Sequence, residues 1–321
     1  MILLIADTPV AGTVQRFSRW LELLTTEPVV CLIKRNYVGN PFSLRETIPI
    51  GSYSKWRDII ISQVKKARRI IVHNINDKET LALIFSNCTD PQKIAYHYHS
   101  PPLEAPCEAY DILNYFEFPV IFTTAQGHSR FVNGAITVPN IVSDYEIPFT
   151  VDRDKVIFLP HLRSTSFRWS AKLTEADIEA LNERKHSLRG FKIKDIKSVF
   201  NRDVVSHDEI LFYLKCIDII IDDINTGLFH QVSIEGLKAG AIVFNGADYY
   251  SVSDFSDAIE APPPPFLFVN DVHDLIDTIS SSVFQKNIRL LQSRSLVYAT
   301  EFLTERRLAT LAVKKLEIFL K

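Results

Sequence analysis

The sequence predicts an α/β protein built from two doubly wound parallel sheets. Short runs of four to six apolar residues recur along the chain, and longer amphipathic stretches lie between them. Runs that are apolar throughout are typical of parallel strands covered on both faces, and their alternation with helices predicts doubly wound sheets. Near the middle of the chain, the alternation of apolar runs and amphipathic stretches is interrupted, so the expected strands and helices fall into two series.

The first series fills residues 1–150, the expected N-terminal domain. Its expected strands are residues 2–5, 29–33, 69–72, 93–96, 120–123 and 136–138. Its expected helices are residues 14–24, 56–67 and 79–86. In the first of these helices, Phe17, Trp20 and Leu21 recur at helical spacing, as in a helix that covers one face of a sheet.

Residues 141–154 have the composition of a linker, and the second series follows over residues 151–300, the expected C-terminal domain. Its expected strands are residues 155–160, 193–199, 217–221 and 241–244. Its expected helices include residues 173–185, capped by Thr174, and 206–216, capped by Ser206, together with 272–280 and 284–320. Four prolines at 262–265 form a stiff extended segment that neither a helix nor a central strand accommodates.

Composition describes a globular protein without a specialised environment. The 321 residues suffice for two domains of about 150 residues, each with its own core. The net charge of −2 gives no overall basic field for nucleic acid, although a local basic groove remains open. The four cysteines lack C-x-x-C spacing, which favours buried thiols in a reducing cytoplasm over a zinc site. No apolar run reaches membrane-spanning length, so we expect a soluble cytoplasmic protein, with attachment to a membrane surface left open.

The most informative segment is residues 217–246. An apolar run ends in two acids and a Thr226-Gly227 loop, a short helix carrying Glu235 follows, Gly240 closes that helix, and a second apolar run comes next. Such a strand, loop, helix and strand unit puts a helix N-terminus at the carboxyl edge of a parallel sheet. Backbone N–H groups and the helix dipole favour a phosphate there.

This segment resembles the donor-binding segment of glycosyltransferases with the GT-B fold. The resemblance implies two Rossmann-like domains that face each other across a cleft, with a C-terminal helix over residues 301–321 returning to the first domain. It also implies that Glu235 holds the ribose of a nucleotide-sugar. Many family members carry a second glutamate eight positions earlier, where this chain has Gly227. Residues 96–102 and 125–140 resemble acceptor-domain loops of the same superfamily.

The donor diphosphate needs cations and N–H dipoles to neutralise it as the glycosidic bond breaks. The loop after residue 160 supplies Arg163, Arg168 and Lys172, and it resembles the family's Arg and Lys pair. Backbone and hydroxyl donors of Thr226, Gly227, His230 and Ser233 would meet the same group. The alternatives are solvated loop charges for the three cations and a packed core residue for His230.

On the acceptor side, Asp7 and His99 are the candidate catalytic residues. Asp7 follows the first expected strand, where it would orient an acceptor hydroxyl or act as a general base, or else cap the next helix. His97 and His99 are expected to point to opposite faces of a strand, so they are not expected to share a metal ion. His99 is the one expected to face the cleft and take a proton, and His128 is expected in a surface loop.

No metal site is predicted. The Asp152-Arg-Asp154 pattern resembles the acidic motif of metal-dependent glycosyltransferases, but it lies in the expected linker without further acids. Asp222 and Asp223 are interpreted as acids at a strand end. The sequence also lacks the glycine motifs of dinucleotide and P-loop sites and the nucleophile elbow of α/β-hydrolases.

We therefore expect a glycosyltransferase that moves a sugar from a nucleotide-sugar to an acceptor hydroxyl, with no resident cofactor or metal. The acceptor could be a glycan, a lipid carrier, a protein or a modified nucleic acid. One alternative is a non-catalytic Rossmann-pair protein that binds a nucleotide or sugar, or serves as an assembly subunit. Another is a sugar isomerase or epimerase on the same fold.

Overall fold

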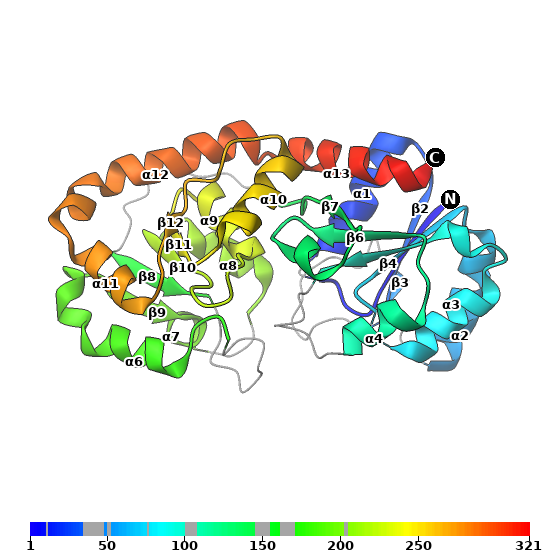
Figure 1. Ribbon diagram of the computed structural model, residues 1–321, viewed down its shortest axis with the longest axis horizontal. Coiled ribbons are helices and arrows are strands. Elements are labelled where there is room, and N and C mark those ends of the chain that lie inside the picture. Colours follow the sequence, from blue (N-terminus) through cyan, green and yellow to red (C-terminus); the bar gives the residue numbers. More distant parts are fainter. Residues whose placement is uncertain are drawn as a thin grey trace. The chain divides into compact units, whose positions relative to one another are not determined.

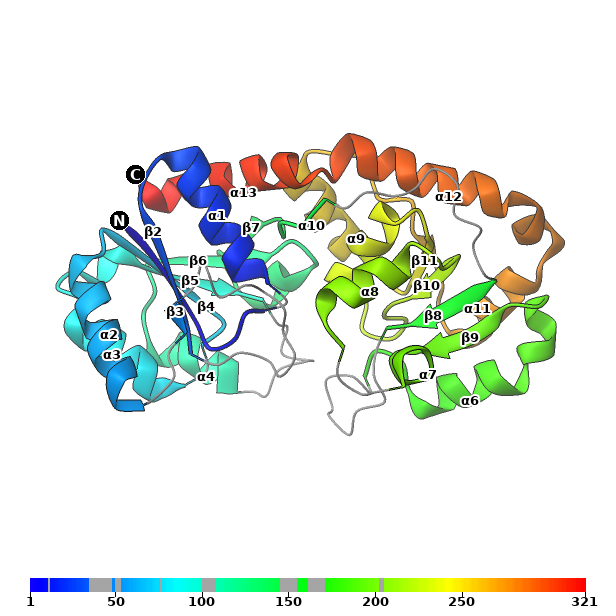
Figure 2. The same ribbon diagram turned by 180° about the vertical axis from the view of Figure 1, so that it is seen from behind.

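The computed structural model describes residues 1–10, 12–34, 48–49, 53–75, 77–99, 108–144, 155–160, 171–201 and 205–321. These residues form two compact units (Figures 1 and 2). The first contains Met1–Ile141 together with Arg306–Lys321, and the second contains Val142–Glu305. Each unit is a parallel sheet with helices on both faces.

The sheet of the first unit has seven described strands in the order β3-β2-β1-β4-β5-β6-β7, and every pairing is parallel. The strands are β1 (Ile2–Ala6), β2 (Val29–Ile33), β3 (Ile48–Pro49), β4 (Arg69–His73), β5 (Ile94–Tyr98), β6 (Val120–Thr124) and β7 (Ile136–Val138). All five residues of β1 are buried, as expected for a strand that is apolar throughout and lies between two layers of helices.

Helices α1 (Thr13–Thr25) and α13 (Glu305–Leu320) pack on one face of this sheet, and α2 (Tyr53–Lys66) and α3 (Lys78–Asn87) pack on the other. The remaining described α-helix is α4 (Glu108–Tyr115). The end of α13 is tied to β4 because the guanidinium of Arg68 donates to the Leu320 carbonyl and that of Arg69 donates to the Phe319 carbonyl, each at 2.6 Å.

The sheet of the second unit has five described strands in the order β12-β11-β10-β8-β9, again all parallel. The strands are β8 (Val156–Leu159), β9 (Lys192–Asp195), β10 (Ile219–Ile221), β11 (Ile242–Asn245) and β12 (Leu267–Phe268). The helices are α6 (Glu175–Glu183), α7 (Ile196–Phe200), α8 (His207–Leu214), α9 (Gln231–Lys238), α10 (Tyr249–Ile259), α11 (Val272–Ser280) and α12 (Ser282–Phe302). Thr174 and Ser206 are the N-caps that the sequence predicts.

Helix α4 and the two-residue strands β3 and β12 were not predicted, and three further elements differ from the sequence predictions. The strand predicted over residues 193–199 ends at Asp195, because Asp195 and Ser198 form a capping box that starts α7. The long C-terminal helix is interrupted after Phe302, where α12 ends with Leu303 as its C-cap, and α13 begins at Glu305. Helix α10, whose N-cap Asp248 accepts a hydrogen bond from Ser251 N at 2.9 Å, was not predicted.

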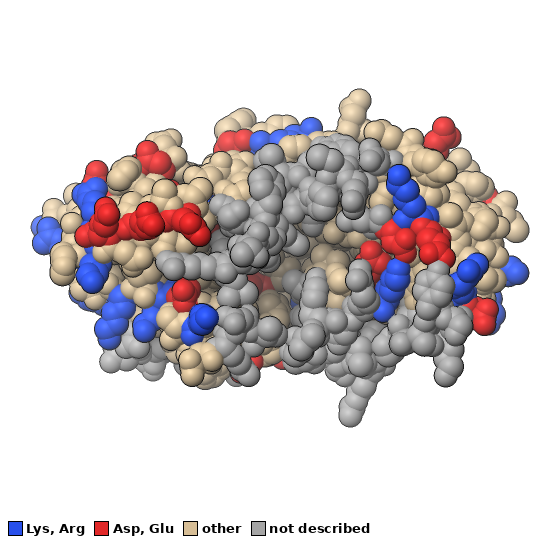
Figure 3. All heavy atoms as spheres, turned by 90° about the horizontal axis from the view of Figure 1, so that it is seen from below, with Lys and Arg blue, Asp and Glu red and all other residues tan. Residues whose placement is uncertain are grey.

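Within the described residues, no helix combines the length and apolarity that a membrane crossing requires. The face in Figure 3 carries basic and acidic side chains interspersed, in keeping with the net charge of −2. Among the described cysteines, Cys31, Cys88 and Cys216 are thiols outside any disulfide.

Candidate functional site

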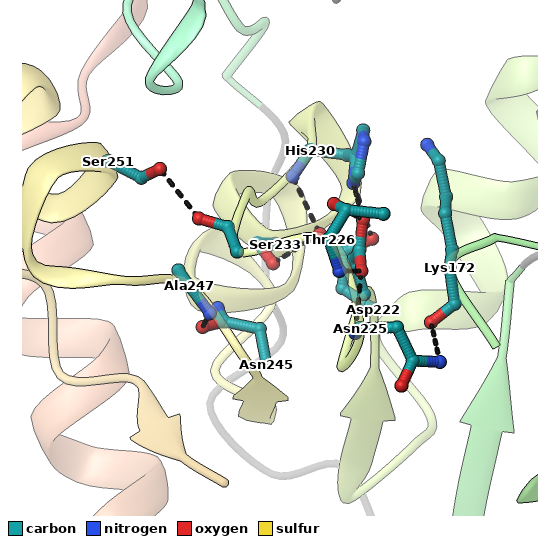
Figure 4. Close-up of polar contacts among 11 residues, drawn as sticks. Lys172, Asp222, Asn225, Thr226, His230, Ser233, Asn245, Ala247 and Ser251 are labelled. Carbon is teal, nitrogen blue, oxygen red and sulfur yellow. Dashed lines mark hydrogen bonds and ion pairs between the residues drawn. The ribbon is translucent and has the colours of Figure 1, made fainter. Parts of the chain in front are cut away.

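The candidate site of the second unit lies at the carboxyl edge of its sheet (Figure 4). All strands are parallel, so β8, β10 and β11 end at the same edge. The loop from β10 to α9 covers this edge, and the residues after β11 lie beside it. Open α/β sheets bind ligands at this kind of edge.

Asp222 fixes the start of α9. Its carboxylate accepts hydrogen bonds from His230 N at 2.7 Å, from the Ser233 hydroxyl at 2.7 Å and from His230 Nδ1 at 3.2 Å. Asp222 is completely buried, so these donors replace the water that a carboxylate would otherwise need. The Ser233 hydroxyl, predicted as a phosphate donor, is therefore engaged by a neighbouring acid.

Asp223 shapes the loop that follows. Its carboxylate accepts from Asn225 N at 3.0 Å, from Thr226 N at 2.9 Å and from the Thr226 hydroxyl. Burial raises the pKa of Asp223, while the neighbouring His230 and the Thr226 hydrogen bond act in the opposite direction. The loop is thus held by two buried acids in succession, which agrees with the interpretation of Asp222 and Asp223 as strand-end acids.

Gly227 allows the tight approach between this loop and α10. Its φ is +75°, in the left-handed region that favours glycine, and a Cβ there would lie 3.2 Å from Asp248 Oδ2. Its carbonyl accepts from Asp248 N at 3.0 Å and from the Ser251 hydroxyl at 2.7 Å. Many glycosyltransferases with the GT-B fold carry a glutamate at this position. In this chain a glutamate would be strained by the left-handed backbone and crowded against Asp248.

Lys172 supplies a buried cation beside the loop. Its carbonyl accepts from Ile224 N at 3.1 Å and from the Asn225 side-chain amide at 3.2 Å. Its side chain, only 1% exposed, extends to the same side of the loop as His230 and Thr226 (Figure 4). Arg163 and Arg168 lie outside the described residues, as do Asp152 and Asp154.

Glu235 is 3% exposed, and its Oε1 accepts hydrogen bonds from His207 Nε2 at 2.7 Å and from Gln231 Nε2 at 2.5 Å. The carboxylate is therefore oriented inside the unit and does not face bulk water. His207 was not predicted from the sequence, because its contact with Glu235 joins α8 to α9 across 28 residues and no local pattern indicates it. The Ser206 cap, which places His207 at the first position of α8, is the nearest signal.

In the first unit, Asp7 follows β1 and forms a 3.9 Å ion pair with Lys34, which also binds Asp77 at 2.6 Å. Helix α1 has Gly12 as its N-cap residue, with no side-chain cap. Asp7 is thus placed at the carboxyl edge of the first sheet, where the sequence predicts it.

The prediction that His97 and His99 point to opposite faces is wrong. Side chains two residues apart on a strand share a face, and the two rings are stacked with centroids 4.0 Å apart. His99 Nε2 lies 2.9 Å from His73 Nδ1, and His99 Nδ1 lies 3.1 Å from the Thr124 hydroxyl. Burial lowers the pKa of His99 to about 3, so this imidazole is neutral and a weak base near pH 7.

His128 also differs from its prediction. It is 1% exposed, whereas a surface loop was expected. It follows Gly127 at the start of the η3 turn (His128–Phe131). No local pattern indicates this burial, because the turn is short and has no hydrophobic period.

Comparison with known proteins identifies the fold. No protein-family model and no curated protein sequence matches the chain. Among solved structures, HepE of Anabaena in complex with UDP and glucose is similar at a TM-score of 0.64 and 12% identity, covering 99% of this chain and 100% of HepE. A glycosyltransferase of Rickettsia africae has a TM-score of 0.56 at 12% identity, covering 99% of this chain and 97% of its own.

A putative UDP-N-acetylglucosamine 2-epimerase of Listeria monocytogenes has a TM-score of 0.53 at 13% identity, covering 100% of this chain and 97% of its own. At sequence identities this low, structural similarity shows a shared fold only. The structural neighbours are glycosyltransferases of one architecture, together with an epimerase. This chain has the GT-B fold of those glycosyltransferases.

Proposed function

We propose that the protein is a glycosyltransferase that moves a sugar from a nucleotide-sugar to an acceptor hydroxyl, with no divalent cation at the diphosphate. The observation that supports this most directly is that the β10–α9 loop and the buried Lys172 lie together at the carboxyl edge of the second unit's sheet, in a chain with the GT-B fold. A lysine, a histidine and a helix N-terminus together can neutralise a leaving diphosphate.

The proposed roles follow the chemistry of each group. Lys172 and His230 contact the diphosphate, with Arg163 and Arg168 as further candidates. Gly227 and Thr226 shape the loop around it. Glu235, oriented by His207 and Gln231, accepts hydrogen bonds from the ribose hydroxyls of the donor. HepE was solved with UDP, so uridine diphosphate sugars are the first donors to test.

In the transfer step, the acceptor hydroxyl oxygen forms a bond to the anomeric carbon of the donor sugar, and the bond from that carbon to the diphosphate oxygen breaks. The nucleoside diphosphate leaves with one additional negative charge, which Lys172 and the α9 N-terminus stabilise. The proton of the acceptor hydroxyl passes to a base. Asp7 is our candidate for this base, because burial lowers the pKa of His99 to about 3 and so removes the advantage that an imidazole has over a carboxylate as a base near neutral pH.

An epimerase is the second candidate, supported by the similarity to the Listeria protein. The two activities give different products from the same donor. A transferase releases a nucleoside diphosphate and a new glycoside, whereas an epimerase of the nucleotide-sugar changes the configuration of the sugar. Chromatography of a reaction with and without added acceptors separates these outcomes.

The test of the proposed function replaces Glu235. We expect Glu235→Gln to reduce nucleotide-sugar turnover about tenfold and Glu235→Ala to reduce it further, because both changes remove a charged acceptor for the ribose hydroxyls. Glu175→Gln, an exposed glutamate in the first turn of α6, is the control and should keep the wild-type rate. Wild-type turnover by folded Glu235→Ala would remove this residue from the donor site.

A further inference from the structure

Three buried histidines converge at the carboxyl edge of the first unit's sheet. His73 is the last residue of β4, His97 is the next-to-last residue of the neighbouring β5, and His99 follows that strand. His73 and His97 are register partners across the two strands. One ring nitrogen from each of the three lies within 4.8 Å of the others. The exposed fractions are 1% for His73, 0% for His97 and 8% for His99.

The hydrogen bonding of these rings is incomplete. Neither ring nitrogen of His97 has a hydrogen-bond partner among the described residues, and the same holds for His73 Nε2. A buried polar atom without a partner is costly, so native structures rarely keep one without a reason. A ring with two such nitrogens, next to two further imidazoles, points to a ligand that accepts nitrogen lone pairs.

We propose that His73, His97 and His99 bind one transition-metal ion of the Zn²⁺ class. Three imidazoles are a frequent zinc ligand set, and they leave one coordination position for water or another ligand. Two imidazole nitrogens about 2 Å from one tetrahedral Zn²⁺ lie about 3.3 Å apart. His73 Nδ1 and His99 Nε2 are 2.9 Å apart, near this value, whereas the set of three nitrogens spans up to 4.8 Å, so the rings must move closer together when the ion binds.

The surroundings of the three rings suit this role. The Thr124 hydroxyl lies 3.1 Å from His99 Nδ1 and can accept its proton, which leaves the Nε2 lone pair directed at the other histidines. The rings of Phe17 and Phe122 pack edge-on against His97, so apolar atoms lie next to the three histidines.

The chemistry also defines which ions should bind. A site of three imidazoles selects borderline metals such as Zn²⁺, Co²⁺ and Cu²⁺, whereas Mg²⁺ and Ca²⁺ prefer oxygen ligands. The proposed ion lies in the first unit, while the proposed donor diphosphate is bound by residues of the second. The metal site is thus independent of the proposed function and can be tested without an activity assay.

The experiment uses the full chain without a polyhistidine tag, stripped of metal with a chelator. Titration with Co²⁺ should give visible d–d absorption that saturates at one ion per chain, and Zn²⁺ should displace that signal while Mg²⁺ should not. His97→Gln should weaken Zn²⁺ binding more than 100-fold, because even changes to residues behind the ligands cost 10–100-fold. Thr124→Val should weaken it about tenfold, since it alters only the orientation of His99.

His186→Gln, at an exposed histidine in the second unit, is the matched control and should bind like the wild type. If His97→Gln does not fold by circular dichroism, X-ray absorption of the Co²⁺-loaded wild type decides, and it should show three imidazole ligands. The proposal is overturned by a wild-type chain that binds no Co²⁺ or Zn²⁺ at micromolar concentration. Unchanged binding in folded His97→Gln, or fewer than three imidazoles around the ion, would overturn it equally.

Discussion

At the scale of single residues, the candidate donor loop depends on how its two buried acids are satisfied. Asp222 accepts from the α9 N-terminus and Asp223 accepts from the loop itself, so each acid organises a different segment. The sequence identifies both residues as strand-end acids, but it does not show which donors they meet. Those donors come from residues up to 11 positions away, and only the folded loop brings them within reach.

Gly227 offers a matched test of loop geometry. Gly227→Ala should destabilise the protein by about 1–2 kcal/mol from the left-handed backbone alone, with an added cost from the contact to Asp248. Gly134 has the same φ of +75°, but a Cβ added there would have no atom within 4 Å, so Gly134→Ala carries the backbone strain without the contact. Urea unfolding should show Gly227→Ala as the less stable variant. Equal stabilities would show that Asp248 does not restrict this position.

At the scale of elements, helix and strand positions follow well from the sequence where the apolar pattern is continuous. The strand at residues 29–33 and the helix at residues 272–280 were predicted with the observed ends. The pattern fails where a side-chain cap outweighs it, as at Asp195, which turns an apolar segment into α7. It also fails for α10, since serines and tyrosines in residues 249–253 are poor helix formers.

Asp77, the N-cap residue of α3, is expected to make the stability of the protein depend on pH. Burial by itself raises the pKa of Asp77, but the hydrogen bonds and charge of Lys34 and the Thr80 hydroxyl outweigh it, so the net pKa is lowered. A carboxyl whose folded-state pKa is depressed stabilises the fold above its unfolded pKa of about 4, and this contribution is lost as pH falls through the folded value.

Asp77→Ala should therefore cost about 1 kcal/mol at pH 7, the usual value of an N-cap, and clearly less near pH 2. Urea unfolding of both proteins across this pH range measures the difference. A cost that stays constant down to pH 2 would show that the cap acts without its charge.

At the scale of the whole molecule, the chain forms two parallel sheets with helices on both faces, as its alternating pattern predicts. What the sequence could not predict is which distant side chains meet. The misplacement of His97 and His99 had a different origin, since two-residue spacing already puts them on one face of a strand. The third member, His73, comes from a neighbouring strand, and its position at the end of the apolar run 69–72 was the available signal.

Lys238 joins the two ends of the second unit to α9. Its ammonium donates to the Val142 carbonyl at 3.0 Å, to Asp144 Oδ1 at 2.7 Å and to the Leu303 carbonyl at 3.0 Å. Lys238→Met keeps most of the side-chain volume and removes all three bonds. We expect a loss of about 2–3 kcal/mol in the free energy of unfolding, since two carbonyls lose a charged donor.

Lys185→Met, at an exposed lysine of the same unit, is the control and should stay within about 0.5 kcal/mol of the wild type. Chemical denaturation monitored by circular dichroism compares the two. Equal stability of both variants would mean that Lys238 does not hold the ends of the second unit.

The central claim is that the carboxyl edge of the second unit's sheet binds a nucleoside diphosphate. Isothermal titration calorimetry of the full chain with UDP, GDP, CDP and TDP tests it most directly. We predict that one of these binds at one molecule per chain and that Lys172→Met weakens it about tenfold or more, whereas Lys185→Met leaves it unchanged. Failure of all four to bind, or wild-type affinity in folded Lys172→Met, would contradict the claim.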